Sequence, residues 1–247
     1  MKKIVVFRSK SPINNSHFLQ RLSALEYQII SYPILEVKKT CYKKLNIKKK
    51  STIFTTSFNS IHFLSELMQQ RDIQLYTMGE ASSILAKKLN FKNIIECNGD
   101  SANMVTVFLE KNKKSLTKKK GDIIYAGAKD ISYDVPKRLE EYGFNVKRYI
   151  LYETKKIEEL SSDFIELVRN KEVKWIVLLS KKGAENFYSL SKKIFSNEEI
   201  SKIKFVCFSK KISDVFKNKS YKTFFPLFPN VNSIIKIILN SEKNYGT

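Results

Sequence analysis

Three segments of this sequence occur twice in the same order, and this repeat limits the folds that the chain can form. Residues 18–39 (FLQRLSALEYQIISYPILEVKK) return as residues 135–156 (VPKRLEEYGFNVKRYILYETKK). Two further segments return in the same way: 52–67 as 175–190, and 75–89 as 205–219. Two copies of one set of units predict two similar lobes, and the cleft between two lobes is a common place for a small ligand.

Strand and helix patterns alternate along the chain. Short apolar, β-branched runs predict strands, and apolar residues at every third or fourth position predict helices. Strands are expected at 3–7, 27–30, 52–55, 75–78, 94–96, 122–125, 145–149, 175–179, 204–208 and 223–225, with extended segments at 33–39 and 150–156. Helices are expected at 16–26, 57–70, 82–88, 101–112, 135–142, 163–170, 183–194, 212–217 and 233–239. This alternation predicts an α/β protein with parallel sheets.

Composition and cysteine usage place the chain among globular proteins of a reducing compartment. The 247 residues suffice for one large domain or two of ordinary size, and 43% of them are hydrophobic. Cys41, Cys97 and Cys207 have no metal-ligand spacing and cannot all pair. The first apolar run is too short for a signal peptide, and no run is long enough to cross a bilayer. We therefore expect a cytoplasmic protein with no membrane partner.

The formal net charge of +21 has two interpretations. A polyanionic partner such as RNA or DNA is one of them. The other is a lysine-rich, solvated surface in a chain whose composition is typical of an AT-rich genome. Only six of the 45 basic residues are arginines, although the arginine fork is the preferred group for phosphates and bases. The solvated surface is therefore favoured, with no nucleic-acid partner, and it is compatible with a positive cleft for an acidic small molecule.

The turns after the predicted strands are rich in serine, threonine and lysine. In parallel sheets these turns line the ligand crevice at the carboxyl ends of the strands. They lie at 8–12, 55–57, 78–80, 98–101, 126–129, 180–182, 209–211 and 226–230. Free backbone N–H groups and the helix dipole at such helix starts suit a carboxylate or phosphate. Plain N-capping explains any single turn equally well, but several such turns facing one cleft favour anion binding.

Several kinds of active site are missing from the sequence. It has no glycine-rich nucleotide-binding motif and no G-x-S-x-G nucleophile. His17 and His62 lie in predicted helices without a partner at metal-ligand spacing. We therefore expect no metal and no cofactor. Chemistry would rest on binding geometry, on backbone donors and on a tyrosine or lysine.

The sequence resembles the uroporphyrinogen-III synthase family over nearly its whole length. The motifs that carry the resemblance are IVVFRSKS, IFTTSFNSIHFL, TMGEASSILAKKL, the turn at 98–101, IIYAGAKD, VKRYILYET, IVLLSKKGAENF and CFSKKISDVF, in family order. The resemblance implies two interleaved flavodoxin-like lobes, each a parallel sheet flanked by helices. Residues 1–33 and 157–247 would form one lobe and residues 41–149 the other. Residues 34–40 and 150–156 would be two bridging strands between them.

The resemblance also implies a lyase reaction. Hydroxymethylbilane, a linear tetrapyrrole with acidic side chains, would lose water and close with its last ring inverted, giving uroporphyrinogen III without a metal or cofactor. The enzyme would act as a monomer on this small-molecule substrate. The alternative is a non-enzymatic two-lobed protein that binds an anionic ligand or RNA.

The family pattern points to particular residues of this sequence. Tyr152 in ILYET matches the tyrosine that assists departure of the hydroxyl group, and a packed strand tyrosine is the other interpretation of this residue. The expected substrate-binding residues are Arg8, Thr56, Ser57, Gly79, Ser82, Gly127, Ser180, Ser209 and Lys210. Ser82 stands in place of a threonine. In the last repeated unit Ser209 and Ile212 stand where the family has glycine and threonine, so Ser209 or Lys210 would have to supply that contact.

Overall fold

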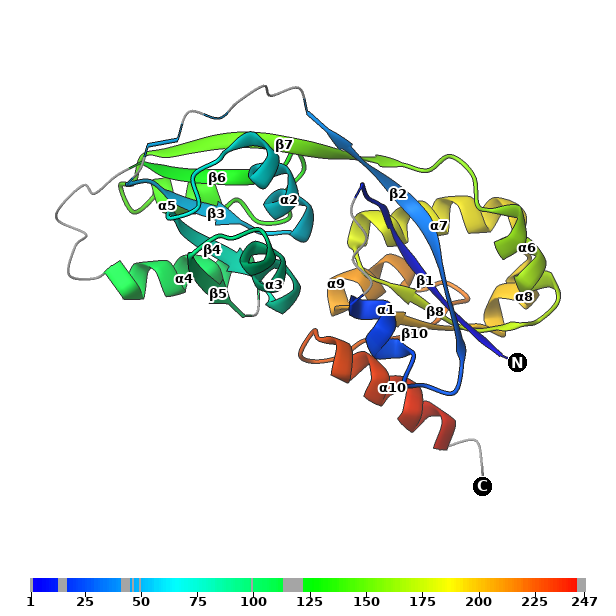
Figure 1. The fold of residues 1–247 in the computed structure, drawn as a ribbon. Coiled ribbons are helices and arrows are strands. Elements are labelled where there is room, and N and C mark those ends of the chain that lie inside the picture. The colour runs from blue at the N-terminus through cyan, green and yellow to red at the C-terminus, as the bar shows by residue number, and fades with distance from the viewer. Residues whose placement is uncertain are drawn as a thin grey trace. The chain divides into compact units, whose positions relative to one another are not determined.

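The computed structural model describes residues 2–12, 17–40, 45, 47–48, 50–98, 100–112 and 122–243. The chain forms two compact units (Figure 1). Unit 1 consists of Met1–Val37 and Lys155–Thr247, and unit 2 consists of Lys38–Thr154. Each unit is an α/β structure in which parallel strands are flanked by helices.

The described residues of unit 1 form five strands in the order β10-β9-β8-β1-β2. The pairs β1–β2, β1–β8, β8–β9 and β9–β10 are all parallel. The strands are β1 (Lys3–Lys10), β2 (Gln28–Lys39), β8 (Val173–Leu178), β9 (Lys204–Cys207) and β10 (Lys222–Phe224). The helices are α1 (His17–Leu22), α6 (Ser162–Arg169), α7 (Lys181–Ile194), α8 (Asn197–Ser201), α9 (Lys210–Ser213), the 3-10 helix η2 (Asp214–Phe216) and α10 (Val231–Lys243).

Strand β1 shows how unit 1 is layered. Val5 and Phe7 belong to a core with side chains of α6, α7, α8 and α9, whereas Ile4 and Val6 belong to a core with α1 and α10. Successive residues of a strand point to opposite faces, so a strand buried on both faces reads as an unbroken apolar run. Helices α1 and α10 contact one another on their shared face, where Arg21 Nη2 donates to Asn232 Oδ1 at 2.5 Å (Figure 1).

In unit 2, the residues that the structure describes form five strands in the order β7-β6-β3-β4-β5, and each neighbouring pair is parallel. The strands are β3 (Thr52–Thr55), β4 (Gln74–Met78), β5 (Asn93–Cys97), β6 (Ile123–Ala128) and β7 (Val146–Lys156). The helices are α2 (Phe58–Leu67), α3 (Glu80–Lys88), α4 (Ser101–Asn112) and α5 (Val135–Glu140). One face of the sheet packs against α4 and α5 around Phe54, Tyr76 and Phe108, and α2 and α3 pack on each other.

The sequence repeat is visible in fine detail in strands β2 and β7. The register of β1 against β2 shifts so that Ile34 is passed over, and the register of β6 against β7 shifts so that Leu151 is passed over. Ile34 and Leu151 occupy equivalent positions of the repeat. The chain also passes from one unit to the other within β2 and within β7, after Val37 and after Thr154, which are again equivalent positions. The two bulged strands are therefore the same structural element used twice.

A buried asparagine holds the bulged part of β2 in unit 1. Asn186 of α7 is 4% exposed, and its Nδ2 donates to the carbonyl oxygens of Ile34 at 2.9 Å and of Ile157 at 2.8 Å. The backbone N–H of Ile157 also donates to the Ile34 carbonyl, at 3.3 Å. A bulge leaves ladder groups without partners, and the Asn186 amide supplies the hydrogen bonds that these two carbonyl groups need.

The structure departs from the sequence-based prediction in several elements. Residues 27–30 and 33–39 are one strand, β2, because Pro33 pairs with Arg8 next to the bulge, where the proline needs to donate no ladder hydrogen bond. Similarly, β7 is one strand rather than two segments. The helix expected at 57–70 ends at Leu67, and the helix expected at 212–217 is the short α9 followed by η2. Helix α8 was not predicted.

Two cysteines lie in the described part of the chain, and both are buried and free. Burial raises the pKa of the Cys97 thiol to about 11 and that of Cys207 to about 12. The prediction that these residues act as small buried hydrophobes is confirmed, whereas Cys41 lies outside the described residues. No helix within the described ranges has the length and apolar character needed to cross a membrane.

Candidate active site

Helix α2 of unit 2 and helix α7 of unit 1 start in the same way, directly after a strand. Ser57 and Ser180 are their N-caps, and each serine Oγ accepts from the backbone N–H three residues later, at 3.1 Å. The two serines are equivalent in the repeat. The positive end of the helix dipole lies at each of these first turns, so each helix start suits a carboxylate.

In unit 2 the helix start is joined by a group of hydroxyl side chains, which we call the hydroxyl cluster: Thr56, Ser57, Ser60, Tyr125 and Tyr152. Thr56 Oγ1 lies 2.9 Å from the Tyr125 hydroxyl, and Ser57 Oγ lies 2.8 Å from the Tyr152 hydroxyl. Ser57 Oγ also lies 3.0 Å from Ser60 Oγ. The cluster thus joins the ends of β3 and β6, the bulged part of β7 and the first turn of α2.

Tyr152 reaches this cluster because of the bulge in β7. After the bulge at Leu151, Tyr152 pairs with Ala128, and its carbonyl accepts from Lys129 N at 2.9 Å. Its ring packs near Phe63, with 5.7 Å between the centroids. The equivalent residue of the repeat in unit 1 is Leu35, which is buried in an apolar core. A phenol hydroxyl therefore occurs in only one copy of the repeat, at a position where the other copy packs an apolar side chain.

Both tyrosines of the cluster stay neutral at ordinary pH. Burial raises the pKa of the Tyr152 phenol, although hydrogen bonds with Ser57, Ser60 and Asn59 act in the opposite direction. Burial likewise raises the pKa of Tyr125, and its hydrogen bond with Thr56 opposes this shift. A neutral phenol keeps its proton, so Tyr152 can donate a hydrogen bond or a proton to a departing oxygen.

Gly127 provides the space for the Tyr125 ring. A Cβ at this position would lie 2.9 Å from Tyr125 Cε1 and 3.1 Å from the Tyr125 hydroxyl oxygen. Gly127 is itself buried and sits in β6, where it pairs with Ile150. It was predicted to bind substrate, but in the structure its contacts are with a member of the hydroxyl cluster.

We expect Gly127→Ala to disturb the hydroxyl cluster. The added methyl group must displace the Tyr125 ring and break its hydrogen bond with Thr56, at a cost of about 2 kcal/mol in the free energy of unfolding. Thermal unfolding measures this loss. Gly143→Ala is the control for a destabilising glycine substitution, since its φ of 80° strains an alanine while its Cβ would meet nothing within 4 Å, away from the hydroxyl cluster. Activity lost in Gly127→Ala but kept in Gly143→Ala is expected, and equal losses in both would contradict the assigned role.

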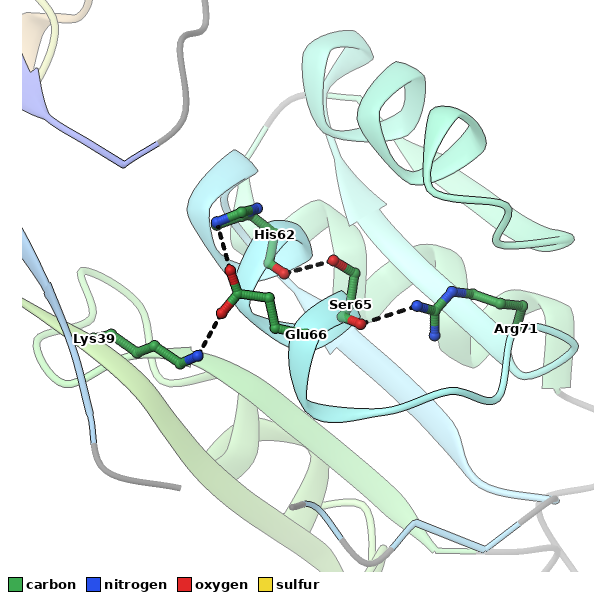
Figure 2. A network of polar contacts seen from close by, with 5 residues as sticks. All are labelled: Lys39, His62, Ser65, Glu66 and Arg71. Carbon is green, nitrogen blue, oxygen red and sulfur yellow. Dashed lines mark hydrogen bonds and ion pairs between the residues drawn. The ribbon is translucent and has the colours of Figure 1, made fainter. Parts of the chain in front are cut away.

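The far end of α2 carries a network of polar side chains (Figure 2). Glu66 lies between His62 and Lys39: its Oε1 is 3.0 Å from His62 Nε2, and its other oxygen pairs with the Lys39 ammonium group. Ser65 Oγ donates to the His62 carbonyl at 2.7 Å, and Arg71 Nη2 donates to the Ser65 carbonyl at 2.9 Å. Arg71 further binds the carbonyls of Met68 and Leu89. The Arg71 contacts satisfy carbonyls at the ends of α2 and α3, and the Glu66–Lys39 pair joins α2 to the end of β2.

His62 is therefore half-buried and paired with a carboxylate, as expected for a residue without metal ligands nearby. The side chain of His17 lies outside the described residues. Across the described ranges, no group of three or more His, Cys, Asp or Glu side chains is placed to hold a metal ion.

The third strand end of unit 2 contains Gly79 and Ser82. Gly79 has a φ of 74°, which favours glycine, and it is the N-cap of α3. Its carbonyl accepts from Ser83 Oγ at 3.4 Å, and Ser83 Oγ lies 2.7 Å from Thr77 Oγ1. Ser82 is only 4% exposed. At this helix start the backbone of Gly79 is more accessible than the hydroxyl of Ser82.

The remaining predicted residues lie at strand ends of unit 1. Arg8 is half-buried in β1, and burial lowers its pKa. Ser180 is exposed at the start of α7. Ser209 precedes α9, a helix of four residues, without a side-chain capping bond. Lys210 is exposed and paired with Asp214 at 2.8 and 2.9 Å. The parallel register brings these residues to one edge of the unit 1 sheet.

Tyr125 and Ser60 were not predicted from the sequence. Tyr125 lies in the apolar run IIYAGA, which indicates a buried strand and gives no sign of a polar contact. The signal that was available is the glycine two positions later, which reflects the space that a large neighbouring side chain needs.

Comparisons with known proteins agree with this architecture. The family model described as uroporphyrinogen-III synthase HemD matches residues 16–236. A uroporphyrinogen-III synthetase structure from Helicobacter pylori is similar with a TM-score of 0.64 and 15% identity, covering 97% of this chain and 99% of that one. A mutant uroporphyrinogen III synthase structure from Thermus thermophilus is similar with a TM-score of 0.53 and 11% identity, covering 98% of this chain and 99% of that one. These two likenesses concern the fold. No curated protein matches the sequence closely enough to add to them.

Proposed function

The chain belongs to the uroporphyrinogen-III synthase family, and we propose that its hydroxyl cluster is the part of the active site where ring closure of hydroxymethylbilane begins. The protein is a lyase of tetrapyrrole biosynthesis. The observation that carries the proposal is the Tyr152–Ser57 pair, with 2.8 Å between its hydroxyl oxygens, at the start of α2.

The reaction needs acid assistance at one atom. The terminal hydroxyl group of the linear tetrapyrrole leaves with the bonding electron pair and a proton, as water, and the remaining carbon becomes an azafulvene-like cation. The substituted carbon of the last ring attacks this cation and forms a spiro intermediate. The intermediate reopens and recloses with that ring inverted, and a ring proton is lost. Overall, one water is released and uroporphyrinogen III is formed.

Tyr152 is the proposed acid in the first step. Its phenol remains protonated because burial raises its pKa. Ser57 Oγ shares a hydrogen bond of 2.8 Å with the Tyr152 hydroxyl and keeps the phenol oriented. When Tyr152 gives up its proton, the hydrogen bonds from Ser57, Ser60 and Asn59 stabilise the phenolate, as their lowering effect on its pKa indicates. The proton returns to Tyr152 when the ring proton is lost.

Acidic side chains of the substrate would bind at helix starts. The proposed contacts are Thr56 and Ser57 in unit 2, and Ser180 and Arg8 in unit 1, because hydroxyl groups, helix N-termini and a positive charge suit carboxylates. Gly79, Ser82, Gly127, Ser209 and Lys210 remain proposals for further contacts. The formal net charge of +21 would speed the approach of a polycarboxylate by electrostatic steering.

We also propose that each unit is a flavodoxin-like lobe. The strand order of unit 1, in its own chain order, is 2-1-3-4-5, the order of flavodoxin-like sheets. In unit 2 the order is also 2-1-3-4-5 when the strands are numbered from β6, so that β7 is second and β3, β4 and β5 follow. This supports two flavodoxin-like lobes in which residues 34–40 and 150–156 serve as bridging strands. We also propose that the protein is a cytoplasmic monomer that acts without nucleic acid.

A product analysis tests the proposed function. Hydroxymethylbilane is supplied to the protein, and the porphyrinogen formed is oxidised and separated by isomer. Formation of isomer III supports the proposal, whereas spontaneous closure gives isomer I. Isomer I alone, together with salt-sensitive binding to unrelated RNAs, would favour the non-enzymatic alternative.

A further inference from the structure

The turn that follows β10 in unit 1 differs from the other strand-end turns in chemistry. Residues 225–229, which we call the apolar loop, have the sequence Phe-Pro-Leu-Phe-Pro. Leu227 is 89% exposed, Phe228 is 78% exposed and Phe225 is 39% exposed. Among the described residues, the other large hydrophobic side chains with such exposure are Tyr142 and Leu239. The exposed apolar surface of the chain is therefore concentrated in this loop.

The apolar loop is held in place at both ends. Before it, Phe224 packs against Trp175, with 5.6 Å between the ring centroids, and Pro226 within the loop is buried. After it, Asn230 Oδ1 accepts from Ser233 N at 2.8 Å, and Asn230 Nδ2 donates to the Phe228 carbonyl at 3.2 Å. Two prolines further restrict its backbone. The side chains of Leu227 and Phe228 are thus presented to solvent by an ordered turn rather than by a free end.

The position of the loop connects it with the candidate site. β10 is parallel to β9, β9 to β8, and β8 to β1, so the loop leaves the same edge of the sheet as Ser209, Ser180 and Arg8. No charged residue lies between Lys222 and Lys236, in a chain of which 28% is charged. This edge of the sheet therefore combines hydroxyl and cationic groups that suit carboxylates with one uncharged, apolar loop.

A tetrapyrrole has the matching combination of acidic side chains and apolar ring faces. We propose that Leu227 and Phe228 bind the pyrrole rings of the substrate while the neighbouring helix starts bind its carboxylates, an inference that rests on the proposed function. Aromatic and aliphatic side chains gain free energy by covering such rings, and a turn that is already ordered loses little entropy on binding. The loop would limit the conformations of the flexible linear substrate.

The double variant Leu227→Gln/Phe228→Gln tests this inference, with Leu239→Gln as the matched control. Leu239 is also exposed, at 47%, but it lies well inside α10. Because the side chains are exposed, neither variant is expected to unfold the protein, which thermal unfolding verifies. We expect the double variant to lower kcat/KM for hydroxymethylbilane about tenfold, through KM, and the control to stay within about twofold of the parent.

The outcomes separate this inference from the proposed function. Isomer III formed by the parent protein tests the function, and the ratio of variant to parent tests the loop. An unchanged kcat/KM in the double variant, while the parent makes isomer III, would overturn the role of the loop alone. A change in sedimentation without a change in kcat/KM would also overturn it, because the loop would then be a contact between copies of the chain. If the parent forms no isomer III, the function and the inference fail together.

Discussion

Tyr152→Phe is expected to slow the formation of uroporphyrinogen III more than about tenfold, since a general acid typically contributes about a hundredfold or more to a rate. The substitution removes only the phenol oxygen and keeps the ring that packs near Phe63. Ser57 keeps its contacts with Ser60, so the start of α2 is preserved. The loss should appear in kcat rather than in KM, because the proposed proton transfer occurs in the transition state.

Tyr221→Phe is the matched control for this experiment. The Tyr221 hydroxyl lies 2.9 Å from Ser191 Oγ in unit 1, so it is also a tyrosine paired with a serine, and burial raises its pKa as well. Each variant is expected to lose about 1 kcal/mol in the free energy of unfolding. Only the change at Tyr152 should affect kcat. Equal rates in Tyr152→Phe and the parent would remove Tyr152 from the mechanism and leave it as a packed strand tyrosine.

Asn186→Leu is expected to cause the largest loss of stability, about 3 kcal/mol. Leucine has the same branched set of side-chain heavy atoms as asparagine, with a larger volume, but donates no hydrogen bond. The Ile157 carbonyl therefore loses the amide that binds it, and the Ile34 carbonyl loses the same donor while keeping the Ile157 N–H. In a chain of this size, such a loss lowers the Tm by roughly 8 °C. Differential scanning calorimetry measures it. Hydrogen exchange at Ile157, whose N–H donates to Ile34, reports whether the change is local.

Asn103→Leu makes the same chemical change at an exposed position. Asn103 lies in α4, and its Nδ2 donates to the Asn98 carbonyl at 2.6 Å, where water can replace it. A loss below about 1 kcal/mol is expected there. If Asn186→Leu were as mild as Asn103→Leu, the bulge in β2 would not depend on the buried amide.

Much of the fold could be predicted from the sequence because local patterns determine it. Within the part of the chain that the structure describes, apolar runs and helical spacing predicted all ten strands and most of the helices. The break expected in β2 is absent. Pro33 pairs with Arg8 of the neighbouring strand next to the bulge, and this long-range pairing accommodates the proline. Helix α8 was missed although Ser196 and Glu199 form a capping box, a signal that can be read in sequence.

The candidate site was only partly predictable. Ser57 and Tyr152 were both identified separately, but their hydrogen bond depends on the bulge at Leu151, which no local pattern predicts. The contact of Tyr125 with Thr56 likewise depends on the pairing of β6 with β3, strands far apart in the chain. Gly127 was predicted as a substrate-binding residue, and in the structure its lack of a side chain leaves room for the Tyr125 ring.

We conclude that this protein converts hydroxymethylbilane to the inverted isomer. The decisive experiment measures the fraction of isomer III in the product as the concentration of the protein is raised against a fixed amount of substrate. We expect this fraction to rise with protein concentration until isomer I is negligible, and we expect Tyr152→Phe to need more than about ten times as much protein for the same fraction. A product that remains isomer I at every protein concentration would show that the protein does not catalyse this reaction.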